Sequence, residues 1–229
     1  MANYYNEKNL EKFSSALREA VNDVKFNRNL QVTISQGNRK MGDVASVSLL
    51  PFLSCPAICK DTCGQICYAA KIANLYKTVL NSYARNQAIA IFRPDVYWTA
   101  VDLAMKSHRF FRFHVSGDIL NAAYFQKMIE TCKNNPGCTE LCFTKKYKIV
   151  NAWIDENGSL PENLKILFSC DVNLIPENPH GLPETVIIRK GTTAGKNVKV
   201  CHGNCFECAL NGVGCWSATA GDCIGFNQH

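Results

Sequence analysis

The feature of the sequence that most restricts its fold is an alternation of strand-like and helix-like segments after residue 108. Four segments have the composition of strands: RFFRFHVSGD (109–118), ELCFTKK (140–146), LKILFSCD (164–171) and ETVIIRKG (184–191). Helical spacing of apolar residues follows the first two, over 121–134 and 147–156. A proline-rich connector follows the third, and NVKVC (197–201) is a weaker strand. Strands that alternate with helices predict a parallel sheet with right-handed crossovers.

The residues before this alternation predict a helix, a hairpin and two more helices. Apolar residues recur at helical spacing over 9–28, and residues 31–51 look like two short strands around a glycine-bounded turn. Helical patterns then cover about 65–92, ending before Pro94, and 96–107. We predict one domain in three parts: a helix and hairpin (1–54), a partial barrel (55–200) and a cysteine-rich segment (201–229).

The two faces of the predicted strands differ in chemistry. In the first strand, Phe111, Phe113 and Val115 alternate with Arg112, His114 and Ser116. A flat parallel sheet covered by helices on both faces would be apolar on both. A curled sheet packs its outer face on helices, and its inner face can line a polar cavity. The predicted fold is therefore α/β, a partial (β/α)6 barrel, with its ligand site at the carboxyl ends of the strands, which read SGD, TKK, SCD and RKG.

The chain has 13 cysteines, and eight of them form two groups. The groups are Cys55, Cys59, Cys63 and Cys67, and Cys201, Cys205, Cys208 and Cys215. A straight helix would place Cys55 and Cys67 roughly 18 Å apart, too far for one four-iron cluster. Proline and glycine within the first group favour turns instead. Either this segment wraps around one cluster, or a subset of its thiols binds the cluster and the remaining thiol serves another site.

The setting of the thiols favours metal chemistry over disulfides. The polar amino end lacks the layout of a secretion signal, and no apolar run is long enough to span a membrane. We therefore expect a cytoplasmic protein, in which grouped cysteines bind a metal or an iron–sulfur cluster. The second group, C-x3-C-x2-C with a fourth cysteine seven residues later, has the composition of a loop and can enclose a compact cluster. Tetrahedral zinc is the alternative.

Other cysteines and histidines leave alternatives open. We expect Cys132 to be a small core residue, as lone cysteines on helices usually are. Cys142 and Cys170 lie near the predicted ligand end of their strands and are either extra ligands or packing residues. No role is assigned to Cys138 or Cys223. His202 and His229 are possible ligands, although terminal histidines usually bind nothing.

The charge of the chain permits an anionic partner without requiring one. There are 25 basic and 19 acidic side chains, a formal net charge of +6. The run TKKYK (144–148) could contact phosphates, with Tyr147 stacking on a base. A solvated start of a helix is the alternative explanation of this run.

Several motifs resemble an uncharacterised bacteriophage family called gene product 88. They are QGNRKMG, SCPAICKDTCGQICYAAK, RFHVSGD and CFECALNGVGCW, and the resemblance covers about residues 33–217. Its most specific parts are CYA (67–69), FHVSGD (113–118) and GCW (214–216). The resemblance implies no particular chemistry, and a phage-encoded protein would work in the cytoplasm of its host.

More distantly, the layout is similar to radical S-adenosylmethionine enzymes. That resemblance implies a partial barrel, a four-iron cluster held by three cysteines, and an open iron that binds the cofactor. Ser116, Gly117 and Asp118 would stand where such enzymes contact the amino group of the cofactor's methionine. The spacing departs from the pattern, because C-x3-C-x2-C is absent from the first group and occurs in the second, after the last strand.

The leading functional prediction is an iron–sulfur protein with more than one 4Fe–4S cluster facing a polar cavity. If it is an enzyme, S-adenosylmethionine is its cofactor, Asp118 holds the amine of that cofactor, and Arg112, His114 and Lys145 bind an unknown substrate or move protons. The alternatives are a non-catalytic iron–sulfur protein and a zinc protein, each binding nucleic acid or a protein partner. His114 could equally be a hydrogen-bonded interior histidine, and SGD an ordinary turn after a strand.

Overall fold

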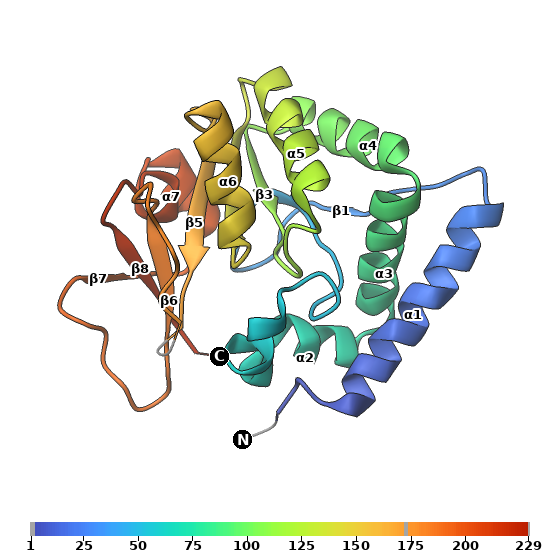
Figure 1. The fold of residues 1–229 in the computed structure, drawn as a ribbon, viewed down its shortest axis with the longest axis horizontal. Helices are drawn as coiled ribbons and strands as arrows, with labels where there is room; N and C mark the ends of the chain where they lie inside the picture. Colours follow the sequence, from blue (N-terminus) through green and yellow to red (C-terminus); the bar gives the residue numbers. More distant parts are fainter. Residues whose placement is uncertain (1–2, 172–173, 229) are drawn as a thin grey trace.

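The computed structural model describes residues 3–171 and 174–228, and within them eight strands form one sheet (Figure 1). The strand order is β1-β2-β3-β4-β5-β6-β8-β7. The strands are β1 (Ile34–Ser35), β2 (Ala45–Val47), β3 (Phe110–Phe113), β4 (Thr139–Thr144), β5 (Leu164–Ser169), β6 (Glu184–Ile188), β7 (Val198–Val200) and β8 (Cys223–Asn227). Only β1 runs antiparallel to its neighbour among these strands, so the predicted hairpin and the predicted parallel core are both present.

Seven α-helices occur in the described part of the chain. They are α1 (Glu7–Phe26), α2 (Tyr68–Leu75), α3 (Lys77–Phe92), α4 (Pro94–Ser107), α5 (Ala122–Asn134), α6 (Tyr147–Asn157) and α7 (Cys205–Leu210). The single helix predicted over 65–92 is two helices, because Tyr76 has an extended backbone, and Figure 1 shows α2 and α3 running in different directions. None of these helices combines the length and apolar character needed to cross a lipid bilayer.

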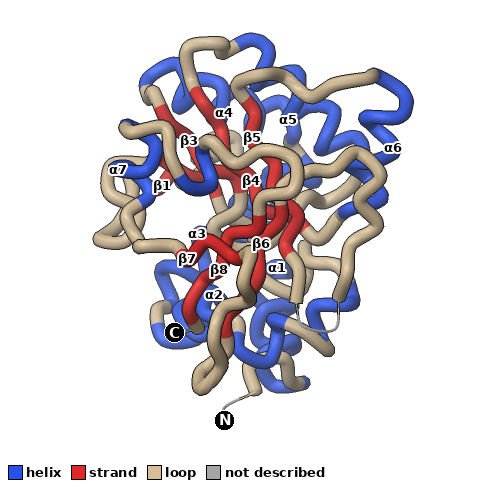
Figure 2. The backbone as a smooth tube through the Cα atoms, turned by 90° about the vertical axis from the view of Figure 1, so that its left-hand side faces the viewer, coloured by secondary structure: helices blue, strands red, loops and turns tan. Residues whose placement is uncertain are grey.

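The two faces of the sheet pack against different parts of the chain, as the alternation of side chains predicts. On one face, Phe111 and Phe113 of β3 and Phe168 of β5 belong to the main core, together with Val101 of α4 and Phe125 of α5. On the other face, Leu141, Leu167 and Ile224 pack in a smaller cluster with Trp216. Figure 2 accordingly shows α6 and α7 on opposite sides of the strands.

The prediction of a partial six-stranded barrel is confirmed in part: the fold is mixed α/β and its sheet is mostly parallel. The sheet has eight strands, is not closed, and is not confirmed as a radical-S-adenosylmethionine-like barrel. The strand that sequence analysis missed is β8, which lies between β6 and β7. Gly225 disguises it, since glycine is depleted in strands. A Cβ there would come within 2.6 Å of Val198 Cγ1 and 2.7 Å of Ile188 Cδ1, so the neighbouring strands require a glycine.

Candidate functional site

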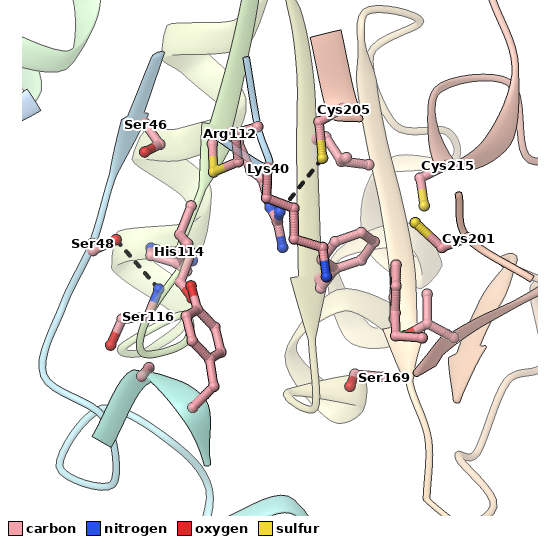
Figure 3. Close-up of a pocket in the computed structure, with 18 of the residues that line it drawn as sticks. Lys40, Ser46, Ser48, Arg112, His114, Ser116, Ser169, Cys201, Cys205 and Cys215 are labelled. Carbon is pink, nitrogen blue, oxygen red and sulfur yellow. Dashed lines mark hydrogen bonds between the residues drawn. The ribbon is translucent and has the colours of Figure 1, made fainter. Parts of the chain in front are cut away.

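A cavity of about 1120 Å³ occupies the face of the sheet opposite α4, α5 and α6. Its walls include Ser46 of β2, Arg112 of β3, Phe143 of β4 and Ile187 of β6, and it reaches the carboxyl ends of β3, β4 and β5. All eight cysteines of the two groups line it. Figure 3 shows Cys201, Cys205 and Cys215 facing the side of the cavity that carries Arg112 and His114. The fold thus brings together two cysteine groups that are more than 130 residues apart in sequence.

The first cysteine group follows a chain of short turns, which confirms the prediction that no straight helix carries it. Two 3-10 helices, Ala57–Lys60 and Cys63–Ile66, replace the α-helix. Interactions with the thiols of Cys55 and Cys63 raise the pKa of the Cys59 thiol. The interaction with Cys59 lowers the pKa of Cys63 to about 6, well below that of an ordinary thiol. These three thiols therefore form one electrostatically linked set.

Cys67 has a different role from the three cysteines before it. It is the N-cap of α2, and its Sγ accepts a hydrogen bond from the backbone N–H of Ala70 at 3.4 Å. Burial raises the pKa of Cys67 to about 12. Cys55 and Cys63 add to this rise, so Cys67 caps α2 and also interacts with the other thiols of its group.

The second cysteine group is not the loop that its composition predicts. Cys205 and Cys208 lie in α7, whose N-cap Asn204 accepts a hydrogen bond from the backbone N–H of Glu207 at 3.1 Å. The glycines and asparagines that predict a loop are confined to the ends of this helix, where asparagine caps are favourable. Cys201 follows β7, and Cys215 lies in the 3-10 helix Gly214–Trp216. Burial raises the pKa of Cys215 to about 12, and Cys201 adds to that effect.

A buried or half-buried cation lies beside each cysteine group. Lys145 Nζ donates to Ser169 Oγ at 2.6 Å. Burial disfavours its charge, but the nearby thiols of Cys63 and Cys59 outweigh burial, and the pKa of Lys145 is raised. Arg112 directs Nη1 to Cys205 Sγ at 4.0 Å, and its guanidinium carbon lies 4.6 Å from the centre of the Phe143 ring. The predicted residues Lys145 and Arg112 thus face different cysteine groups.

Asp118 lies at the cavity, but its carboxylate is already engaged by the protein. Oδ1 accepts hydrogen bonds from Thr144 Oγ1 at 2.5 Å and from the N–H of Ile119 at 2.8 Å. Oδ2 accepts from the N–H of Lys145 at 2.9 Å. Burial raises the pKa of Asp118, while these hydrogen bonds favour its ionised form. Asp118 therefore joins the loop after β3 to the end of β4 and places Lys145 at the cavity.

Gly117 allows this loop to pass close to the segment after β2. Its φ is +85°, and a Cβ would come within 2.5 Å of Ser54 Oγ and 2.8 Å of Leu49 Cβ. We predict that Gly117→Ala lowers the free energy of unfolding by about 2–3 kcal/mol and the melting temperature by roughly 5–10 °C, measured by circular dichroism. Gly191→Ala is the control, because its φ is +81° but no atom lies within 4 Å of the new Cβ. Equal effects of the two substitutions would contradict the close approach at Gly117.

His114 and Ser116 both line the cavity but differ in their partners. His114 has a φ of 57°, which breaks the alternation of the strand and turns its ring toward the helices. There its Nε2 lies 2.9 Å from Tyr124 Oη, and burial lowers its pKa to about 3, so the ring is neutral. The Ser116 backbone N–H donates to Ser48 Oγ at 3.2 Å, but the Ser116 hydroxyl is buried without a hydrogen-bond partner (Figure 3).

The remaining residues named by sequence analysis lie mostly outside the cavity. Cys132, Cys138 and Cys142 are buried in the main core, and Cys170 donates to Glu184 Oε2 at 3.6 Å. These four and Cys223 do not line the cavity. His202 does line it, whereas His229 lies outside the described residues. The Tyr147 hydroxyl donates to the carbonyl of Ser169 and its ring packs on Phe168, which leaves the residue half-buried.

Sequence analysis missed Tyr68, which stands between the two cysteine groups. Its hydroxyl donates to the carbonyl of Val115 at 3.5 Å, and its pKa is raised, chiefly by burial and also by the nearby Cys67 and Cys205. The signal that could have found it is its position directly after Cys67, at the start of a helix.

The donor set at the cavity restricts which inorganic group could bind. All 13 cysteines are free thiols, so no disulfide competes for them. Within residues 3–171 and 174–228, no three His, Cys, Asp or Glu side chains are arranged to hold a metal ion. Zinc bonds to sulfur at about 2.3 Å and needs four ligands converging on one point. A metal ion or a cluster at this cavity therefore stays a prediction.

Comparison with known proteins identifies the family of the chain. No curated protein and no solved structure matches the chain. A family model described as Gene product 88 matches residues 12–205. The match includes the first cysteine group, the loop after β3, Cys201 and Cys205, and it ends before Cys208 and Cys215. Because this match covers most of the chain, the protein belongs to the Gene product 88 family.

Proposed function

We propose that this protein binds two iron–sulfur clusters that face one cavity. The observation that carries the proposal is that eight free thiols, from two segments far apart in sequence, line the same cavity in two separate sets. Burial is the principal cause of the raised pKa of Cys67 and of Cys215, and thiols of the same group add to it. The causes of these two shifts include no carboxylate and no imidazole. Thiolates are the ligands that iron–sulfur clusters use.

The first cluster is held by Cys55, Cys59 and Cys63 in this proposal. Their mutual interactions support it. Cys55 and Cys63 also raise the pKa of Cys67, but we leave Cys67 out of the set because its sulfur accepts the hydrogen bond that caps α2. Three thiolates on a four-iron cluster leave one iron without a protein ligand. That iron could bind a small molecule, and the resemblance noted above suggests S-adenosylmethionine. Lys145, buried beside these thiols, offsets their negative charge.

The second cluster is held by Cys201, Cys205, Cys208 and Cys215. Burial is the main cause of the raised pKa of Cys208 and of Cys215, and the other thiols of the group raise it further. These mutual effects support one set of four. Four thiolates leave no open iron, so this cluster would store or transfer electrons, or hold the C-terminal segment against the sheet. Arg112 offsets its charge in the way that Lys145 does for the first cluster.

The residues around the first cluster would orient a bound molecule. A reduced open-iron cluster supplies an electron that can cleave a sulfonium cofactor. Asp118 acts as a positioning residue, because its oxygens hold the backbone of Lys145. The Ser116 hydroxyl is left to contact the ligand. His114 is neutral and bonded to Tyr124, so we assign it a structural hydrogen bond in place of proton transfer.

We expect protein purified and reconstituted without oxygen to contain about eight iron atoms and as many sulfides per chain, as two four-iron clusters require. The measurements are iron analysis, acid-labile sulfide analysis and the visible absorption spectrum. Stoichiometric zinc without sulfide would contradict the proposal and favour the zinc alternative.

One observation favours a non-catalytic version of the same protein. The three hydrogen bonds that Asp118 accepts leave it poorly placed to hold the amine of a cofactor. Incubating the dithionite-reduced protein with S-adenosylmethionine separates the two versions. Methionine and 5′-deoxyadenosine among the products indicate an enzyme, and unchanged S-adenosylmethionine indicates a cluster-binding scaffold.

A further inference from the structure

We propose that the cavity binds a small molecule that carries an oxyanion, a phosphate or carboxylate group, and that Arg112 receives this group. The inference names the ligand class of the proposed site. It rests on the proposed function for any reaction, but the binding itself needs only the cavity.

The charges on the cavity wall favour an anion. The lysines and arginine that line it are Lys40, Arg112, Lys145 and Lys199. Asp118 is the one carboxylate among its described lining residues, and hydrogen bonds from Thr144 and from two backbone N–H groups occupy its oxygens. Lys199 forms an ion pair with Asp222 at 2.7 Å, outside the cavity lining. Before any cluster binds, basic side chains therefore outnumber carboxylates on this wall, which favours an anion.

Arg112 is the cation best placed to bind the anion. It projects from β3, a central strand, onto the floor of the cavity, and no carboxylate of the described chain pairs with it. A guanidinium has five N–H donors in a planar fork. Here one nitrogen reaches Cys205 Sγ at 4.0 Å, and Nε is buried without a partner. Because one face of the group lies on Phe143, its edge is the part that remains for a ligand.

Ser116 supplies a second unsatisfied group in the same cavity. The residue is 3% exposed, and its backbone is fixed by hydrogen bonds to Ser48 Oγ and from the N–H of Leu49 to its carbonyl. Its hydroxyl has no partner. Four buried side-chain polar atoms of the described chain lack partners, and those of Arg112 and Ser116 are the two from residues lining the cavity. Figure 3 draws the Ser116 hydroxyl well apart from the Arg112 guanidinium, so one oxyanion does not meet both groups. Since unsatisfied buried donors are costly, each of the two points to its own absent acceptor, and Ser116 would meet a different part of the bound molecule.

The shape of the site favours a small molecule over nucleic acid. A cavity of about 1120 Å³ has the volume of a small-molecule site with additional room for clusters. Arg112 lies on the floor of the cavity. The wall opposite Ser46 and Ser48 is formed by apolar residues such as Ile187, Ile224 and Phe226. A small organic molecule could place its oxyanion at Arg112 and its apolar part against this wall.

The test is calorimetric titration of the full chain, reconstituted without oxygen, with inorganic phosphate and separately with succinate. We expect one or both to bind, and the stronger of the two identifies the oxyanion. Arg112→Gln should weaken binding at least about tenfold, as loss of a charge-assisted hydrogen bond does. Arg112→Lys should have an intermediate effect because it keeps the charge but loses the fork. Arg85→Gln is the matched control, because Arg85 is an exposed arginine paired with Asp23 on the surface.

Melting temperature and iron content are measured for each variant, so that a folding defect is recognised. If Arg112→Gln does not fold, Arg112→Lys carries the test. The proposal is overturned if neither probe binds, or if both Arg112 variants bind as the wild type does. It is also overturned if an oligothymidylate binds wild type and Arg112→Gln equally and displaces phosphate. Anion binding through Arg112 in protein that holds no iron supports this inference while refuting the proposed function, so the two failures are distinct.

Discussion

Replacing Cys63 or Cys208 with alanine is expected to remove about half of the iron and acid-labile sulfide from the reconstituted protein, because each substitution disables one of two four-iron clusters. Cys63 belongs to the set of interacting thiols in the first group, and Cys208 lies in α7 beside Cys201 and Cys205. The loss should appear as a matching decrease in visible absorbance, with lower solubility where the cluster holds a segment in place.

Two further cysteine variants make this experiment specific. Cys67→Ser should keep its iron, because a serine hydroxyl can replace the thiol as the N-cap of α2. Cys223→Ala should also keep its iron, since Cys223 is partly exposed and lies outside the cavity lining. Full iron content in both Cys63→Ala and Cys208→Ala would show that the ligands are assigned wrongly. Loss of iron in Cys67→Ser would add Cys67 to the first set.

Replacing Glu140 with glutamine is expected to stabilise the protein, and increasingly so as the pH rises. Glu140 of β4 is fully buried, and its Oε2 has no hydrogen-bond partner. Burial raises its pKa from 4.5 to about 9, so the folded protein keeps this proton at neutral pH. The unfolded chain releases it above pH 4.5. The unfolded state therefore binds fewer protons between pH 4.5 and pH 9, and the free energy of unfolding falls as pH rises through that window.

The expected size of the effect follows from the same linkage. Each pH unit in the window is worth ~1.4 kcal/mol, so the difference between Glu140→Gln and wild type should grow by on the order of 4 kcal/mol from pH 5 to pH 8. Urea unfolding at several pH values measures it. His114, whose pKa burial lowers to about 3, reduces stability as pH falls below 6.5 in both proteins and cancels in the comparison. Glu130→Gln on the exposed face of α5 is the control and should show no such growth. A constant difference between Glu140→Gln and wild type would refute burial of a protonated carboxyl.

The sequence alone was sufficient for the parts of the fold that depend on local pattern. The alternation of Phe111 and Phe113 with Arg112 predicted which face of β3 meets the helices, because successive side chains of a strand point to opposite faces. Proline and glycine in the first cysteine group excluded a straight helix for the same local reason. The eight cysteines were also predicted to gather at one cavity, since parallel strands present their carboxyl ends at a common edge.

Features that depend on partners distant in sequence required the tertiary structure. The strand β8 exists because β6 and β7 pair with it on both sides, although Gly225 weakens its local signal. The roles of Asp118 and Cys67 depended on which donors came within reach of their side chains. No sequence pattern shows that the Thr144 hydroxyl and the backbone N–H of Lys145 donate to the Asp118 carboxylate. Likewise, Arg112 faces one cysteine group and Lys145 the other only because adjacent strands set them apart across the cavity floor. Hydrophobic periodicity is a property of neighbouring residues, whereas the partners of a buried polar group are set by how the whole chain packs.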